Sequence, residues 1–118
     1  MSGKLSTHVL DNYHGRPAQG VYWKLSRLSA ENQWEEMSEG QTNADGRTDG
    51  PLLADGALTT GRYRLSFKID HYYADSKVPL PSTPFLDVIS IEVNLQAGER
   101  YHVPLLMTPW SYSTYRGS

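Results

Sequence analysis

Alternation of apolar and polar residues recurs along this chain, and it is clearest over residues 61–70. The odd positions of that segment carry Tyr63, Leu65, Phe67 and Ile69. A period of two with one apolar side is typical of an antiparallel strand that buries one face, so a strand is predicted there. The same pattern covers residues 86–95 and, beyond a turn that contains Gly98, residues 100–108. The spacing of these two segments predicts a β-hairpin.

Turn-forming residues separate further strand-like segments in the first half of the chain. The remaining predicted elements are strands at residues 5–10, 21–28 and 34–37, a turn at Asp45-Gly46, a loop over residues 50–60 and one helical turn at residues 70–75. About seven or eight strands with at most one short helix are typical of an all-β sandwich of two sheets. The length of 118 residues fits a single domain, spanning residues 1–118.

Composition and charge exclude several classes of function. The chain has no cysteine, which excludes disulfides, thiolate metal sites and cysteine nucleophiles. The 11 Lys and Arg residues against 13 Asp and Glu residues give a net charge of -2, which offers no basic field for nucleic acid. We therefore expect no nucleic-acid partner. A chain this short buries proportionally little surface, so self-assembly is expected.

The sequence also indicates where the protein works. Its longest apolar runs are far shorter than the roughly 20 residues of a membrane-spanning helix, which predicts no membrane partner. The first residues contain no apolar stretch of signal-peptide length, so a cytoplasmic location is predicted. The mature form of an exported protein, which has lost its signal peptide, would also begin without such an apolar stretch.

Four histidines are the side chains that titrate near neutral pH without help, so acid–base chemistry would begin with them. They are His8, His14, His71 and His102. His8 and His102 interrupt otherwise regular strand patterns, although such a histidine is more often a structural residue. Arg47 follows the Asp45-Gly46 turn and could hold an anion or a polarised carbonyl through its planar guanidinium, or it could be a solvated turn residue.

Other catalytic motifs are missing from the sequence. It has no metal-ligand spacing of histidines or carboxylates, no Gly-x-Ser-x-Gly elbow, no Walker loop and no dinucleotide fingerprint. Neither a metal nor a nucleotide cofactor is therefore predicted. The aromatic end of the chain, with Trp110, Tyr112 and Tyr115, either docks against another surface or is a disordered tail.

Several short motifs carry a family resemblance. They are residues 6–11 (STHVLD), 15–18 (GRPA), 42–47 (TNADGR), 101–106 (YHVPLL) and 115–118 (YRGS). In this order they resemble the 5-hydroxyisourate hydrolases, the transthyretin-related enzymes of urate breakdown. The resemblance runs from residue 5 to residue 118, and its final YRGS distinguishes the enzymes from the hormone carrier transthyretin. Residues 71–73 and 78–84 match only loosely, so no functional residue is carried over there.

The resemblance implies a transthyretin-like two-sheet β-sandwich with one short helix. It implies pairing through edge strands, a homotetramer of 222 symmetry and active sites in the channel between dimers. It implies a small-molecule substrate, 5-hydroxyisourate, and no cofactor. A non-catalytic small-molecule carrier of the transthyretin type is the alternative on the same fold.

The resemblance also assigns the site. The implied catalytic residues are His8, Arg47, His102 and Ser118. The implied substrate-binding residues are His8, Arg47, Tyr115, Arg116 and Gly117. One histidine, His102 in preference to His8, is expected to be the general base on water, with His8 as its partner in orienting or relaying the proton. Arg47 is expected to be the donor to the substrate oxygens. His14 and His71 are expected to be ordinary surface or loop residues.

Overall fold

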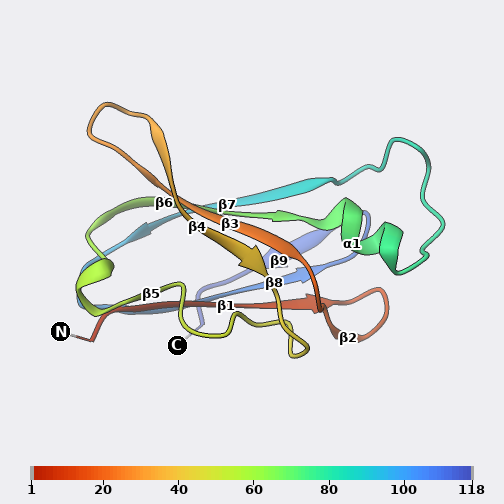
Figure 1. The fold of residues 1–118 in the computed structure, drawn as a ribbon, viewed down its shortest axis with the longest axis horizontal. Helices are drawn as coiled ribbons and strands as arrows, with labels where there is room; N and C mark the ends of the chain where they lie inside the picture. Colours follow the sequence, from red (N-terminus) through yellow and green to blue (C-terminus); the bar gives the residue numbers. More distant parts are fainter. Residues whose placement is uncertain (1, 118) are drawn as a thin grey trace.

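The fold is a sandwich of two β-sheets, which Figure 1 shows as two layers with α1 at one end. The structure is a computed structural model that describes residues 2–117. Sheet A has the strand order β2-β1-β8-β9, with β5 also paired to β1, and sheet B has the order β4-β3-β6-β7. The elements are β1 (Lys4–Asp11), β2 (Arg16–Pro17), β3 (Tyr22–Leu28), β4 (Trp34–Gln41), β5 (Leu53–Ala54), a 3-10 turn (Asp55–Ala57), β6 (Gly61–Lys68), α1 (Ile69–Asp75), β7 (Val88–Leu95), β8 (Arg100–Met107) and β9 (Tyr112–Thr114). The prediction of an all-β sandwich with one short helix is confirmed.

The core forms because alternate residues of both sheets point inward. On β6 the buried side chains are Tyr63, Leu65 and Phe67, as the alternation predicts. The strand ends at Lys68, and Ile69 opens α1 where its N–H donates to the Asp87 carbonyl at 2.8 Å. The predicted helical turn is therefore confirmed and begins one residue earlier than expected.

The predicted hairpin of residues 86–95 and 100–108 is wrong. β7 pairs with β6 in sheet B, whereas β8 pairs with β1 and β9 in sheet A. Both strands bury their odd-numbered residues, and a connection that crosses between the layers lets both of those faces meet the same core. The crossing turn is held by two backbone N–H groups, that of Gln96 donating to the Tyr101 hydroxyl and that of Ala97 donating to Thr60 Oγ1.

Three further segments show what the sequence pattern missed or left open. The predicted loop over residues 50–60 contains the short strand β5 and the 3-10 turn. β1 pairs with β8 in parallel, although the two strands are far apart in the sequence. The aromatic tail docks, because β9 pairs antiparallel with β8. Within the described part of the chain, no helix has the length and apolar character needed to cross a membrane.

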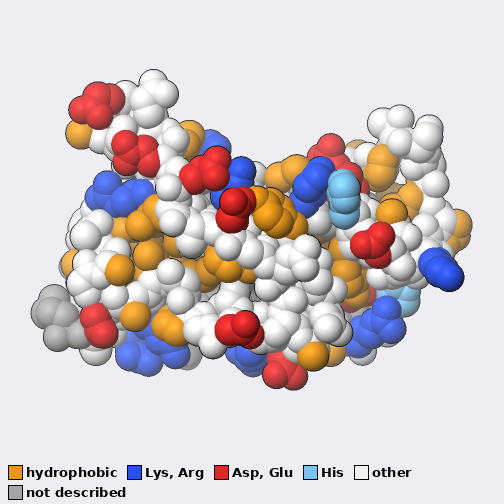
Figure 2. Space-filling view, in the orientation of Figure 1, with side chains coloured by type: hydrophobic (Ala, Val, Ile, Leu, Met, Phe, Trp, Pro, Cys, Tyr) orange, Lys and Arg blue, Asp and Glu red, His pale blue; other side chains and the backbone are white. Residues whose placement is uncertain are grey.

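Charged side chains of both signs cover the surface of the sandwich. On the face shown in Figure 2, acidic side chains gather over the protruding end of β3 and β4. The sequence of β4 contains Glu35, Glu36 and Glu39. Lys and Arg side chains occur along the sheet A side of the same view. Apolar side chains show between the two layers, where the sandwich edge is open.

Candidate functional site

The outer face of sheet A carries both predicted catalytic histidines. β1 buries every second residue, so Lys4, Ser6 and His8 point away from the core. The parallel register places Ser6 beside His102 of β8 and His8 beside Pro104. Residues two apart on a strand lie about 7 Å apart on one face, so the two histidines stand on adjacent rungs of the sheet.

Arg47 reaches this face through a tight turn. Asn43 Oδ1 accepts hydrogen bonds from the N–H groups of Asp45 and Arg47, at 2.9 and 3.1 Å. Gly46 has a φ of 74°, and a Cβ there would stand 2.4 Å from the Val9 carbonyl oxygen, so only glycine fits. The turn therefore packs directly on β1.

The packing of this turn brings Arg47 and the first histidine together. His8 and Arg47 form an antiparallel bridge on the side of β1 opposite β8. His8 Nε2 also lies 2.9 Å from the Asp45 carbonyl oxygen. The backbone of this one turn therefore contacts the His8 imidazole and places Arg47 beside His8.

The tail closes the other side of the site. The Gly117 N–H donates to the His102 carbonyl at 2.6 Å, and the two residues form an antiparallel bridge. A Cβ on Gly117 would stand 3.0 Å from Cδ2 of the His102 ring, so the tail lies against the imidazole itself. Across sheet A the order is therefore the Arg47 turn, β1 with His8, β8 with His102, and the tail.

The neighbours of His102 decide its protonation. Burial is the largest cause that lowers the pKa of this imidazole below its ordinary value. The nearby charges of Arg47, His8 and Lys4 lower it further. His102 is therefore neutral at neutral pH and able to accept a proton, in a positive field that favours oxygen-rich or anionic ligands.

Two of the predicted tail residues take different positions. Arg116 stacks its guanidinium over the Tyr101 ring at 4.4 Å, and its Nη2 lies 3.5 Å from Glu99 Oε1. Tyr115 is exposed and, with Arg116, lines a groove of about 420 Å³ between β7 and β8 at the open edge of the sandwich. Ser118 lies outside the described residues.

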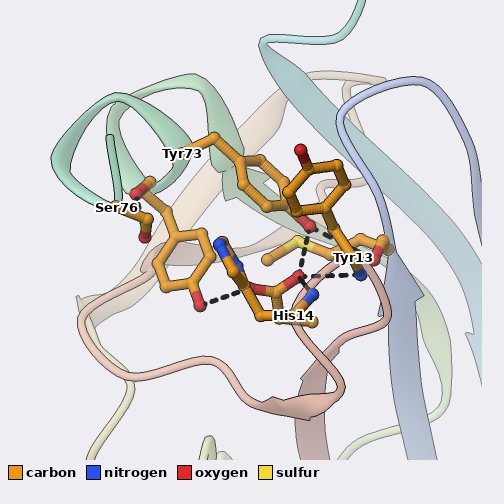
Figure 3. A network of polar contacts seen from close by, with 7 residues as sticks. Tyr13, His14, Tyr73 and Ser76 are labelled. Carbon is orange, nitrogen blue, oxygen red and sulfur yellow. Dashed lines mark hydrogen bonds and ion pairs between the residues drawn. The ribbon is translucent and has the colours of Figure 1, made fainter. Parts of the chain in front are cut away.

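The remaining histidines lie elsewhere. His14 Nδ1 is 2.5 Å from Oδ2 of the fully buried Asp11, in the polar network of Figure 3. His71 is an exposed residue of α1. Neither shares the rungs of His8 and His102.

Two residues of this face were not singled out as site residues from the sequence. Ser6 Oγ lies 2.9 Å from His102 Nδ1, and Lys4 contributes to the lowered pKa of that ring. The period of two along β1 contained the information, because it places both residues on the side of His8. In the described residues, no group of three His, Cys, Asp or Glu side chains is arranged to hold a metal ion.

Comparison with known families decides the affiliation of the chain. The model of the HIUase/Transthyretin family matches residues 5–117. The chain belongs to this family. A relative from Deinococcus radiodurans, a 5-hydroxyisourate hydrolase, is 46% identical over 121 residues and covers 100% of both chains. The resemblance inferred from the short motifs is thus confirmed.

Solved structures of the HIUase/Transthyretin family share the fold. Klebsiella pneumoniae 5-hydroxyisourate hydrolase is 34% identical, with a TM-score of 0.80 over 98% of this chain and 99% of that chain. Sea bream transthyretin, solved in complex with thyroxine, is 28% identical, with a TM-score of 0.86 over 97% of this chain and 94% of that chain. Because the fold accommodates an enzyme and a carrier alike, the side chains of the site must distinguish them.

Proposed function

We propose that this chain hydrolyses 5-hydroxyisourate to 2-oxo-4-hydroxy-4-carboxy-5-ureidoimidazoline, a step in urate breakdown. The observation that carries the proposal is the outer face of sheet A, where a turn, two strands and the tail bring Arg47 beside His8 and Gly117 beside His102. Relatives that carry the name 5-hydroxyisourate hydrolase, 46% and 44% identical along nearly the whole chain, support the same activity. We propose that residues 1–118 form one catalytic domain that needs no cofactor.

The reaction needs a base for water, donors for a developing oxyanion and a proton for the leaving nitrogen. Water oxygen bonds to the ring amide carbonyl carbon while His102 takes one of the two water protons. The C–N bond then breaks, and the departing nitrogen receives that proton from the imidazolium. The lowered pKa of His102 supports this role, because the ring is neutral before the reaction.

Arg47 acts on the substrate rather than on the water, and His8 supports Arg47. The guanidinium offers several N–H donors in one plane, which suits two neighbouring carbonyl oxygens of a purine-like ring. In the substrate complex it stabilises the negative charge that develops on the attacked carbonyl oxygen. His8 orients this arrangement through its contact with the backbone of the Arg47 turn.

The tail completes the binding site. Gly117, in contact with the His102 ring, lets the backbone approach the substrate closely, and Ser118 offers a hydroxyl group for substrate or water. Tyr115 lines the groove between β7 and β8 instead. Arg116 holds the tail in place through Tyr101 and Glu99. These contacts favour a role for Arg116 in supporting the tail rather than in contacting the substrate.

The active assembly in this proposal is a homotetramer of 222 symmetry with sites in the channel between dimers. β7 and β9 are edge strands of their sheets, and they flank the apolar groove at the open side of the sandwich. Exposed apolar side chains on these strands include Val88 and Tyr112. Unpaired edges with apolar side chains favour pairing with a second copy.

A carrier of the transthyretin type is the competing function, favoured by the TM-score of 0.86 to sea bream transthyretin. A carrier needs apolar and hydroxyl groups in its channel and has no use for two imidazoles and a guanidinium. The chemistry of the site therefore favours hydrolysis.

The test is the loss of 5-hydroxyisourate absorbance, with the substrate generated in place by oxidation of urate. We expect the purified protein to accelerate this loss well beyond spontaneous decay, and the His102→Ala variant to lose most of the acceleration. Tight binding of substrate without acceleration would instead indicate a carrier. Decay at the spontaneous rate with no binding would reject both functions.

A further inference from the structure

The two site histidines are hydrogen-bonded at different ring nitrogens, His8 at Nε2 and His102 at Nδ1. His8 Nε2 lies 2.9 Å from the carbonyl oxygen of Asp45. A carbonyl oxygen only accepts, so the contact requires a proton on His8 Nε2. In the neutral ring, the lone pair of His8 is then on Nδ1.

His102 is held at the opposite ring atom. Its Nδ1 lies 2.9 Å from Ser6 Oγ, which stands beside it in the parallel register of β1 and β8. A serine hydroxyl can accept from Nδ1–H and direct its own proton to water, or it can donate to an unprotonated Nδ1. The contact is partly buried, and among residues 2–117 His102 Nε2 makes no hydrogen bond to protein. Nε2 is therefore the nitrogen available to substrate and water.

We propose that Ser6 is a positioning residue that holds His102 with its proton on Nδ1 and its lone pair on Nε2, while the Asp45 carbonyl holds His8 in the opposite tautomer. The inference rests on the proposed function, because a base must present its lone pair at the nitrogen that faces the water. The two histidines then have different roles. His102 takes up and releases the proton, whereas the N–H of His8 donates to the Asp45 carbonyl in the turn that carries Arg47.

The direct test reads the tautomers without any reaction. Long-range proton–nitrogen NMR of the histidine-labelled wild-type protein, recorded well above the lowered pKa of His102, distinguishes protonated from unprotonated ring nitrogens. We expect a protonated Nδ1 for His102 and a protonated Nε2 for His8. A His102 ring protonated on Nε2, or one that populates both tautomers equally, would overturn the proposal. This measurement needs no variant, so it stands even if a substitution disturbs folding.

Variants then connect the tautomer to catalysis. Ser6→Ala should populate both His102 tautomers and lower kcat about 10-fold, the scale of one lost hydrogen bond, with KM changed less than about twofold. Ser6→Thr keeps a hydroxyl and should restore both the spectrum and kcat. Ser66→Ala is the matched control, since it also removes a strand hydroxyl that bonds another hydroxyl, Ser90 Oγ at 3.2 Å, but in sheet B. It should leave both readouts unchanged.

The outcomes separate this inference from the proposed function. Acceleration by wild type with an unchanged His102 spectrum and unchanged kcat in Ser6→Ala would reject the role of Ser6 and leave the hydrolase standing. A wild-type protein without acceleration would reject the hydrolase, whatever the tautomers are. A tautomer shift accompanied by the predicted fall in kcat, reversed by threonine, would support both.

Discussion

At the scale of single residues, the shape of a cation matters as much as its charge. Arg47→Lys keeps the positive charge beside His8 but removes the planar set of donors. If the guanidinium holds two substrate oxygens, kcat/KM should fall about 10-fold or more. Steady-state kinetics on freshly generated 5-hydroxyisourate would measure it.

Arg62→Lys provides the control for this substitution. Arg62 is an exposed residue of β6 in the other sheet. Its replacement should change the activation free energy of the reaction by no more than about 0.5 kcal/mol. Near wild-type turnover in a folded Arg47→Lys protein would show that Arg47 is only a solvated turn residue.

The pH dependence of the reaction belongs to His102. Burial and then the charges of Arg47, His8 and Lys4 lower its pKa, and the protonated ring cannot accept a proton from water. The rate should therefore stay constant from about pH 8 down to about pH 6.5, the ordinary histidine value, and fall only below it. A stopped-flow pH profile corrected for spontaneous decay would measure this fall in the rate. A rate that is flat down to about pH 5 would remove His102 from the role of base.

Some residues of the candidate site could be predicted from the sequence, and others could not. Short motifs were sufficient to predict His8, Arg47 and His102, and the structure brings all three to sheet A. Ser6 and Lys4 share their face by the same alternation, but serine and lysine are so common on exposed strands that their type alone indicates nothing. Their position at the site follows from the strand register, which depends on a parallel pairing that no local pattern encodes.

At the scale of elements, a buried carboxylate ties the β1–β2 turn to the helix (Figure 3). Asp11 has no exposed surface and accepts hydrogen bonds from the hydroxyls of Tyr72 and Tyr73 on α1, at 2.7 and 2.9 Å. It also accepts from the N–H groups of Tyr13 and His14. Burial alone would raise the pKa of Asp11, but the hydrogen bonds outweigh burial and hold the pKa below its ordinary value.

Asp11→Asn should therefore lower the free energy of unfolding by about 3 kcal/mol, because an amide cannot accept all of these donors. Since the folded-state pKa is lowered, the contribution of the carboxylate is present above the ordinary value of 3.8 and is lost as the pH falls through the folded-state value. Urea titrations at several pH values would measure the difference between variant and wild type. Asp75→Asn, at the exposed end of α1, is the control and should have little effect. A stable Asp11→Asn protein would show that the network is not structural.

The tail is an element whose removal separates function from stability. A chain ending at Thr114 keeps β9 but loses the contact of Gly117 with His102. We expect most of the hydrolysis to disappear, while the melting temperature falls by no more than about 4 °C, the shift that about 1 kcal/mol produces in a small domain. Activity assays and thermal melting would measure both effects. Full activity would make the tail a mere family marker, and a collapse of the melting temperature would make its role structural.

Element prediction failed where the partner of a strand mattered. The period of two located β6, β7 and β8 correctly, and turn residues marked their ends. It could not show that β7 and β8 belong to different sheets, because a hairpin and a crossing between layers bury the same alternate residues. The two-residue strands β2 and β5 are too short to show any period.

At the scale of the whole molecule, the protein is predicted to assemble from four chains. The edge strands β7 and β9 leave apolar side chains and unpaired backbone on one side of the sandwich. Light scattering at micromolar concentration should report about four times the 13.3 kDa chain mass. A monomer would contradict the proposed channel and leave the sites open to solvent.

A complex with a non-hydrolysable purine-like analogue of the substrate would show where the active site lies. The crystal structure of that complex should place the analogue on the outer face of sheet A. Its oxygens should lie within about 2.6–3.2 Å of the Arg47 guanidinium, and its attacked carbon should face a water bonded to His102. An analogue held in the groove between β7 and β8, with no contact to Arg47 or either of the two histidines, would show that the active site is not on the outer face of sheet A.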